Sequence, residues 1–339
     1  NLTVNAIVDA DNFKINNAQG TDGQLLTSTG SGVAWEDAPA GGPTFKTFGT
    51  DSIMIGDDAT GTINNANKNV GLGVNVFESL TTGDSNVAIG FDAGKSVVSG
   101  YENTFVGLYA GLNAVNNEAI AIGSYSMYSN VGSTSGDIAI GMGSMQYKNG
   151  AAGNTIAIGT YAHRGGSTTT GRANIAIGPY AMQSITTGTY NTSVGHHALN
   201  SITAGAGNVA MGDSTLRQNT TAHNNTAIGN IALSQNTTGT QNVAVGANAL
   251  DANTTASYNV AIGGTSLTDN STGASNVAVG YGSLANNTTA SSNTAVGRDS
   301  LLANTTGTNN VAMGYQALKT NTTGTGNTIV GRMAGFSNT

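Results

Sequence analysis

Aromatic side chains gather in one stretch of this sequence, and they are the residues best suited to recognising a ligand. Eight of the 11 tyrosines fall between Tyr101 and Tyr190. Exposed aromatic rings favour contacts with sugars and proteins because they offer a large area at low entropic cost. Four of the tyrosines and one histidine share one position of a repeating unit described below. We take them as candidate receptor-binding residues: Tyr109, Tyr125, Tyr161, Tyr180 and His197. Alternatively, these rings fill gaps left by the longer repeat units.

Two carboxylates are the best candidates for catalysis. Glu102 and Glu118 each lie five residues before the glycine that closes a repeat unit. Stacked on adjacent units they would be about 5 Å apart, near the separation used by retaining glycosidases. Because no third polar group joins them and no cleft is implied, we predict that the chain is not an enzyme. A glycan depolymerase is the less favoured alternative.

The histidines do not suggest a metal centre. They fall in different positions of the repeat or are immediate sequence neighbours, whereas a zinc site needs converging ligands. We therefore expect surface histidines, no metal and no cofactor. The four residues are His163, His196, His197 and His223.

A regular repeat positions all of these side chains. The phrase Asn86-Val-Ala-Ile-Gly90 returns with small changes along the chain, and the glycine that closes it recurs 17 times. Successive closing glycines differ by 17 in number, except between Gly107 and Gly178, where the differences are 16, 18, 18 and 19. The closing glycines are Gly56, Gly73, Gly90, Gly107, Gly123, Gly141, Gly159, Gly178, Gly195, Gly212, Gly229, Gly246, Gly263, Gly280, Gly297, Gly314 and Gly331.

Each position of the unit, which we call a column, has its own chemistry. β-Branched residues alternate with Ala before the closing glycine, as expected of a short strand. A small residue and then Leu or Met follow the glycine, as in Ala249-Leu250, and an Asn-Thr-Thr turn comes next. One unit is therefore predicted to form one coil of an all-β, parallel β-solenoid with a rise of about 4.8 Å per coil.

The columns also predict an oligomer. A coil should bury about three apolar side chains, worth roughly 6 kcal/mol in all, against about 1 to 1.5 kcal/mol of ordering entropy for each of its residues. So thin a core needs a second buried surface. We expect the large side chains of the strand to face the core and its Ala and Gly face to pack against other copies. Three coils around an axis would bury that face on all sides, which predicts a homotrimer.

Seven asparagines share the turn column: Asn219, Asn236, Asn253, Asn270, Asn287, Asn304 and Asn321. Singly they match glycosylation sites, but as a column they are better explained as a ladder whose side-chain amides bond along the axis. The adjacent threonines, among them Thr237, Thr254, Thr288 and Thr305, leave an ice-binding face as a further, less favoured alternative.

The beginning of the chain differs from the repeats. We expect strands at residues 2–8 and 24–29, with the second joined by a turn at residues 30–32 to a strand at residues 33–35. A Gly/Pro linker at residues 39–43 then places a boundary near residue 45. The predicted domains are a hairpin-like connector at 1–45 and a repeat shaft at 46–339.

Composition excludes several classes of partner. The net charge is −7, with 11 Lys and Arg against 18 Asp and Glu. Nucleic acid binding depends on clustered Lys and Arg, so nucleic acid is not expected as a partner. No apolar run approaches the roughly 18 residues of a membrane span, so membrane insertion is not expected either.

The phrase Asn86-Val-Ala-Ile-Gly90 resembles the head repeat of trimeric autotransporter adhesins, which are left-handed parallel β-rolls, although their repeats are shorter than the unit found here. The longer unit, as in residues 225–239, looks more like the shafts of bacteriophage tail fibres. Residues 23–37 are similar to hairpin-like connectors near the start of many phage fibre proteins. The resemblance thus implies a left-handed β-roll, with one coil for each repeat unit, in a homotrimeric fibre.

The same resemblance implies a structural, host-contacting role. The chain would space or present receptor binding in the tail of a virion, an extracellular location. Other tail or surface-anchoring proteins would adjoin its N-terminal end, and a host surface glycan or protein would be its target. A trimeric adhesin on a bacterial cell surface is the alternative.

Overall fold

The computed structural model describes residues 66–114, 117–131, 135–149, 153–166 and 169–336, together with six short strands before them. The chain divides into two compact units, Asn1–Thr44 and Phe45–Thr339. No helix within the described ranges has the length and apolarity needed to cross a membrane.

The first unit contains two antiparallel strand pairs. Strand β3 (Gln24–Ser28) pairs with β4 (Val33–Asp37), with Leu26 opposite Trp35, and this confirms the predicted hairpin. Strand β1 (Lys14–Ile15) pairs with β2 (Ala18–Gln19). The strand expected at residues 2–8, the turn at 30–32 and the linker at 39–43 lie outside the described residues.

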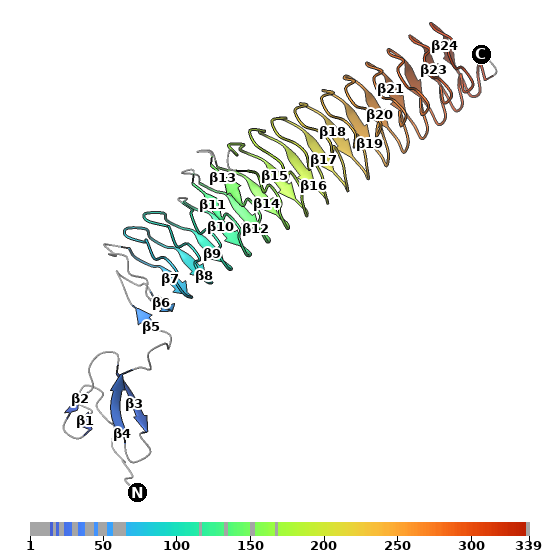
Figure 1. Ribbon diagram of the computed structural model, residues 1–339. Coiled ribbons are helices and arrows are strands. Elements are labelled where there is room, and N and C mark those ends of the chain that lie inside the picture. The colour runs from blue at the N-terminus through green and yellow to red at the C-terminus, as the bar shows by residue number, and fades with distance from the viewer. Residues whose placement is uncertain are drawn as a thin grey trace. The chain divides into compact units, whose positions relative to one another are not determined.

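The second unit is a parallel β-solenoid of about 15 turns with about 17 residues per coil, as the repeat predicts. Figure 1 shows its strands stacked one above the next along a rod. Neighbouring strands pair in parallel so that equivalent columns face one another, as Ala244 faces Ala261. Before this stack comes β5 (Thr44–Lys46), and the stack itself consists of β6 (Ile53–Gly56), β7 (Val70–Leu72), β8 (Val87–Ile89), β9 (Thr104–Val106), β10 (Ile120–Ile122), β12 (Ile138–Ile140), β14 (Ile156–Ile158), β15 (Ile175–Ile177), β16 (Thr192–Val194), β17 (Val209–Met211), β18 (Thr226–Ile228), β19 (Val243–Val245), β20 (Val260–Ile262), β21 (Val277–Val279), β22 (Thr294–Val296), β23 (Val311–Met313) and β24 (Thr328–Val330).

The closing glycine lets successive coils approach closely. Gly246 has a φ of 131°, a conformation that side chains disfavour. A Cβ added to it would lie 2.6 Å from the backbone of Gly263 in the next coil. Three further residues of a regular coil have left-handed φ values, for example Gln241, Asn248 and Leu250 at 55° to 57°. These bends close the coil within a single repeat unit.

The interior of a coil is narrow, and the expected orientation of the strand is wrong. In the coil of β19 the fully buried apolar side chains are Ala244, Ala249 and Leu250, so the core is as thin as predicted. The alanine of the strand points into this core, whereas Val243 and Val245 on either side are partly exposed. The large side chains therefore face outward, because the inward position lies too close to the opposite wall to admit them.

One exception shows how narrow the interior is. Phe105 takes the place of the inward alanine in β9 and is fully buried. The column that holds Leu or Met in most coils carries Gly94 and Gly111 beside it, and a Cβ added to either would collide with the Phe105 ring. A large ring fits into the alanine column only where two neighbouring residues have lost their side chains.

Two buried asparagine ladders run along the rod. In the turn ladder, which confirms the expected bonding along the axis, Asn253 Nδ2 donates to Asn236 Oδ1 at 2.8 Å, and the contact repeats as far as Asn321. The strand ladder uses the first asparagine of the repeated phrase. There the backbone N–H of Asn259 donates to Asn242 Oδ1 at 3.0 Å, while Asn259 Nδ2 donates to the Gly273 carbonyl. These amides satisfy buried polar backbone groups that the thin core could not otherwise accommodate.

Where the repeat length changes, an ion pair replaces the ladder amides. Asp137 occupies the column of the strand ladder. Lys148 occupies the column that holds asparagine from Asn219 onward, and it lies on strand β13 (Tyr147–Lys148), which pairs with β11 (Ser129–Asn130). Both side chains are fully buried, and Lys148 Nζ donates to both Asp137 carboxylate oxygens at 2.8 Å. Burial lowers the pKa of Lys148, and the Asp137 charge opposes that shift.

His163 lies beside this ion pair, so the expectation that every histidine is on the surface is wrong. It occupies the buried Leu or Met column and has no exposed surface. Its Nε2 lies 3.4 Å from Asn174 Nδ2. Burial, helped by the Lys148 charge, lowers the pKa of His163 to about 4, so the ring is neutral at pH 7.

Candidate functional site: an interrupted aromatic ladder

The five candidate receptor-binding residues lie in one column, two residues after the closing glycine. Each has a left-handed φ between 54° and 59°. Each backbone N–H donates to a carbonyl of the preceding coil, as Tyr125 N–H does to Leu108 O and Tyr161 N–H to Met142 O, both at 2.9 Å. This register stacks the side chains along the rod. All five are half-buried, so part of each ring meets solvent.

The first group of rings lies after strands β9 and β10. The centroids of Tyr109 and Tyr125 are 5.1 Å apart, and Phe91 meets Tyr109 edge-on at 5.5 Å. Tyr128 closes the group, 5.5 Å from Tyr125. These separations are typical of favourable aromatic contacts. The rings therefore support one another as well as facing solvent.

The second group lies after strands β14 to β16. Tyr161 and Tyr180 are 5.9 Å apart, and Tyr180 stacks on His197 at 5.0 Å with the planes 12° apart. Partial burial and the neighbouring His196 and Arg217 lower the pKa of His197. His196 lies 2.8 Å from the Asp213 carboxylate, and this contact lowers the pKa of Asp213.

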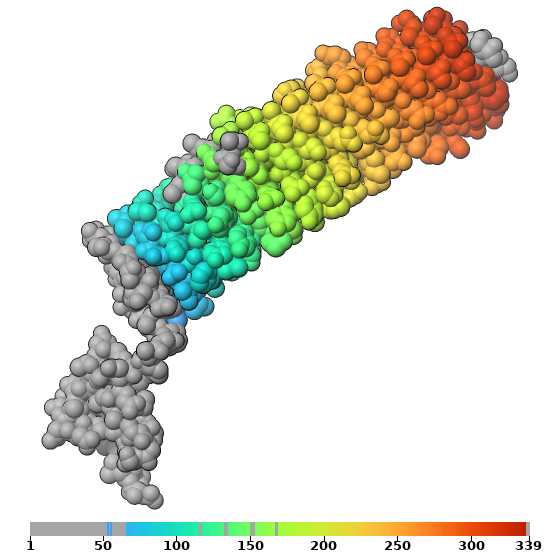
Figure 2. Space-filling view, viewed as in Figure 1, coloured from blue at the N-terminus to red at the C-terminus, as the bar shows by residue number. Residues whose placement is uncertain are grey.

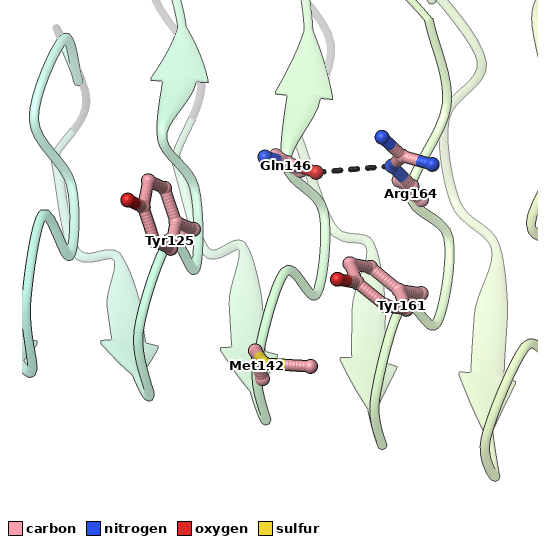
Figure 3. A pocket seen from close by; sticks show the side chains of 5 residues that line it. All are labelled: Tyr125, Met142, Gln146, Tyr161 and Arg164. Atoms are coloured by element: carbon pink, nitrogen blue, oxygen red, sulfur yellow. Dashed lines mark hydrogen bonds between the residues drawn. The ribbon is translucent and has the colours of Figure 1, made fainter.

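A single glycine separates the two groups. Gly143 occupies the aromatic column in the coil between Tyr125 and Tyr161, with a φ of 61° like that of its neighbours. The missing side chain leaves a hollow of about 260 Å³, which we call the Gly143 gap, lined by Tyr125, Met142, Gln146, Tyr161 and Arg164. Figure 3 shows the two tyrosines on either side of Met142, with the Tyr161 ring leaning toward the coil of Gly143. Consistently, a Cβ added to Gly143 would meet that ring at 2.5 Å.

Arg164 gives the Gly143 gap its only charged lining group. Its Nε donates to Gln146 Oε1 at 3.0 Å, the contact dashed in Figure 3. Its guanidinium lies 5.1 Å from the centre of the Tyr161 ring and 5.8 Å from that of Tyr147. Such cation–π contacts hold the group in place. Among the described residues, no oxygen accepts a hydrogen bond from its two η nitrogens, which stay available for a ligand.

The other candidates for chemistry do not assemble a site. Glu102 and Glu118 occupy the same exposed turn of adjacent coils, and the backbone N–H of Glu118 donates to Tyr101 O. Over the part of the chain that the structure describes, no three His, Asp or Glu side chains are placed to hold a metal ion.

Sequence reasoning missed the residues that shape the gap. Gly143 stands where the neighbouring coils carry tyrosine, and this absence is visible once the column is aligned across the change in repeat length. Gln146 and Arg164 share another column, five residues after their closing glycines. Their approach to the aromatic column depends on the path of the coil, which the sequence does not give.

Comparison with protein-family models, with curated proteins and with solved structures finds no match to this chain.

Proposed function

We propose that this chain is the shaft of a homotrimeric, host-contacting fibre of the phage tail-fibre type, located on the outside of a virion. The β-roll would be left-handed, and other tail proteins would adjoin its N-terminal end. The observation that carries the proposal is an apolar strip along the rod, which we call the outer apolar ladder. It consists of the large side chains that flank the inward alanines.

The outer apolar ladder is too long and too exposed for a chain that works alone. Exposed fractions are 38% for Ile228, 41% for Ile262 and 42% for Met313, and the strip continues from β7 to β24. Monomeric soluble proteins rarely expose contiguous apolar patches beyond a few hundred square ångströms. About 15 turns at about 4.8 Å give a strip of about 70 Å. The residue before each closing glycine is Ile, Val, Leu or Met throughout, and a strip with this constant column suits a second and a third copy of the same chain, coil against coil.

The rod also suits a spacing role. Figure 2 shows the described coils of the second unit as an elongated rod. From Gly195 onward the coils have a constant length, so a specific partner could not tell one from the next. The half-buried rings of the aromatic column, from Tyr109 to His197, lie where the coil lengths change. This position favours the region for contact with a host receptor.

The competing functions receive less support. In the turn threonines the hydroxyl groups donate along the axis, as Thr237 Oγ1 does to Thr254 O at 3.0 Å. Those hydroxyls are engaged by the protein and are poor candidates for ordering ice. The exposed Glu102 and Glu118 pair lies on an open turn, which offers a glycan depolymerase no cleft. A bacterial trimeric adhesin would share the outer apolar ladder. It would differ from a tail fibre in being anchored to a bacterial cell surface.

Sedimentation velocity of the full chain tests the trimer. We expect the unaltered chain to sediment as an elongated trimer, and the double variant Ile228→Lys with Ile262→Lys to sediment as a smaller species, because both charges would enter the interface. The matched control is Thr238→Lys, on an exposed turn, which should stay trimeric. An unaltered chain that sediments as a monomer, or a double variant that remains trimeric, contradicts the proposal.

Adsorption tests the host contact separately. A variant with Tyr109, Tyr125, Tyr161 and Tyr180 changed to Ser should still sediment as the trimer and should adsorb poorly to host cells. Undiminished adsorption by that trimer would place receptor binding on another protein. Labelling intact particles and cells with an antibody against the chain distinguishes a virion tail from a bacterial surface.

A further inference from the structure

The Gly143 gap has the width of one ring. Tyr125 and Tyr161 are separated by one intervening coil, so their backbones are about 10 Å apart, twice the rise of about 4.8 Å per coil. The Tyr161 ring takes up part of this distance, since a Cβ on Gly143 would meet it at 2.5 Å. The space left between that ring and Tyr125 admits one ring-shaped group, because carbon atoms in contact lie about 3.5 to 4.0 Å apart. The hollow of about 260 Å³ is slightly smaller than the pockets of about 300 Å³ and above that take drug-sized ligands.

The two sides of the gap differ in polarity. The Tyr125 ring and the Met142 side chain, which is 45% exposed, form an apolar wall and floor. The Tyr161 hydroxyl, the Gln146 amide and the Arg164 guanidinium supply polar groups, and Figure 3 shows Gln146 and Arg164 together on one side. A pyranose ring has the matching character, with an apolar face of C–H groups and an edge of hydroxyl groups.

The charge of the gap narrows the ligand further. Arg164 is the only charged group that lines it. The nearby Lys148 is fully buried and paired with Asp137, so it does not reach the gap. With Nε already bonded to Gln146, the η nitrogens of Arg164 can pair with a carboxylate, the partner that a guanidinium binds most effectively. A neutral sugar would leave this charge unused.

We propose that the Gly143 gap binds a carboxylate-bearing pyranose of a host surface glycan, a uronic or sialic acid residue. The apolar face of the sugar lies against Tyr125 and Met142, and its carboxylate pairs with Arg164. This proposal names the class of host molecule that the fibre would contact, and to that extent it rests on the proposed function. Binding itself is a property of one chain and does not require the fibre to be a trimer.

Saturation-transfer NMR and calorimetric titration of the full chain test the proposal, with methyl glucuronide, N-acetylneuraminic acid and methyl glucoside as probes. We expect one of the acidic sugars to bind saturably to the chain at millimolar concentration. Methyl glucoside should not bind. Arg164→Gln should weaken binding tenfold or more, because it removes a charged hydrogen bond. The matched control is Arg298→Gln, which removes an arginine that lies 5.8 Å over the Tyr281 ring in a regular coil and should leave binding unchanged.

A second variant fills the gap and keeps every lining residue in the sequence. Gly143→Tyr continues the aromatic column, whose backbone conformation is similar at Tyr125 and Tyr161. The Tyr161 ring must turn away to admit the new side chain, since a Cβ on Gly143 would lie 2.5 Å from it, and binding should be abolished. Gly282→Tyr is its control, since Gly282 occupies the same column in a regular coil with a φ of 65°. Far-ultraviolet circular dichroism verifies that each variant is folded.

The outcomes are separable. Equal binding of methyl glucuronide and methyl glucoside, binding that survives both Arg164→Gln and Gly143→Tyr, or no binding of either acidic sugar overturns the proposal. Binding of an acidic peptide at the gap in place of the sugars also overturns it and assigns the gap to a protein ligand. Sedimentation of the same samples reports the trimer independently, so failure of the gap and failure of the fibre give different results.

Discussion

The irregular coils between Gly107 and Gly178 and the regular coils after Gly195 belong to one stack of parallel strands but differ in their interior and surface side chains. In the regular coils the interior consists of Ala from the strand, a small residue (Ala, Ser or Thr) and Leu after the closing glycine, and buried asparagine amides. In the irregular coils the ladders give way to Asp137 and Lys148, His163 replaces a leucine, and the surface carries stacked rings around Gly143. The regular coils build length, whereas the irregular coils carry the features that could distinguish one place on the rod from another.

The largest expected effect comes from converting the irregular interior into the regular one in two steps. Lys148→Asn alone leaves the Asp137 carboxylate buried without a cation, which typically costs about 3 to 5 kcal/mol. Adding Asp137→Asn places ladder amides in both columns and should restore stability to within about 1 kcal/mol of the unaltered chain, since well-packed neutral groups often replace a buried ion pair without loss. Chemical denaturation of the three proteins measures this. A double variant as unstable as the single one would show that the charges have a role the amides cannot fill.

The next effect is a pH dependence that belongs to the irregular coils. His163 has a folded pKa of about 4, below its ordinary value of 6.5, so between these values the unfolded chain binds more protons. Stability is therefore greatest above pH 6.5 and falls as the pH drops toward 4, by about 3 kcal/mol in total. His163→Met, which matches Met145 and Met182 in the same column, should remove this loss.

Thermal unfolding between pH 4 and 7 measures that difference. His223→Gln, at an exposed histidine, is the control and should keep the pH profile of the unaltered chain. Identical profiles for the unaltered chain and His163→Met would contradict the assignment of the pH dependence to His163. Lys148 and Asp137 are the charged groups that face His163, and both are present in the two proteins.

The smallest expected effect transfers a feature of the irregular region into a regular coil. Ala244→Phe overpacks the narrow interior and should cost about 1 to 3 kcal/mol. Adding Leu233→Gly and Leu250→Gly reproduces the arrangement of Phe105 with Gly94 and Gly111 and should recover part of the loss.

Thermal midpoints of the single and triple variants measure this, with Thr238→Phe on an exposed turn as the control. A triple variant less stable than Ala244→Phe would show that the space around Phe105 does not depend on those two glycines.

Much of this fold could be predicted from the sequence, because a solenoid repeats its local chemistry. The closing glycines locate the coils, the alternation before them locates the strands, and the asparagine column predicts the turn ladder. The orientation of the strand could not be predicted from alternation, which defines two faces but not which of them is enclosed. The width of the coil decides that, and only alanine fits the inward position at Ala244 and Ala261.

The interior of the irregular coils was predictable in part. His163 lies four residues after Gly159, in the column that holds Leu199 and Leu250 in later coils, so its burial follows from careful alignment of the columns. Lys148 likewise aligns with the turn asparagines. The changing coil lengths obscured both alignments. The Gly143 gap depends on the approach of Arg164 and Gln146 to the aromatic column, and that approach is set by the three-dimensional path alone.

The hydrogen bonds between coils have a mechanical consequence. They run from one strand to the next along the rod, so tension applied to the two ends of the rod pulls on them lengthwise, and every junction between coils carries the whole load. Each junction is held by its backbone bonds and by the ladder contacts that it carries. The strand ladder has no amide at Ala119, Asp137 and Thr155, so under tension the rod should yield first in the coils that also hold the Gly143 gap.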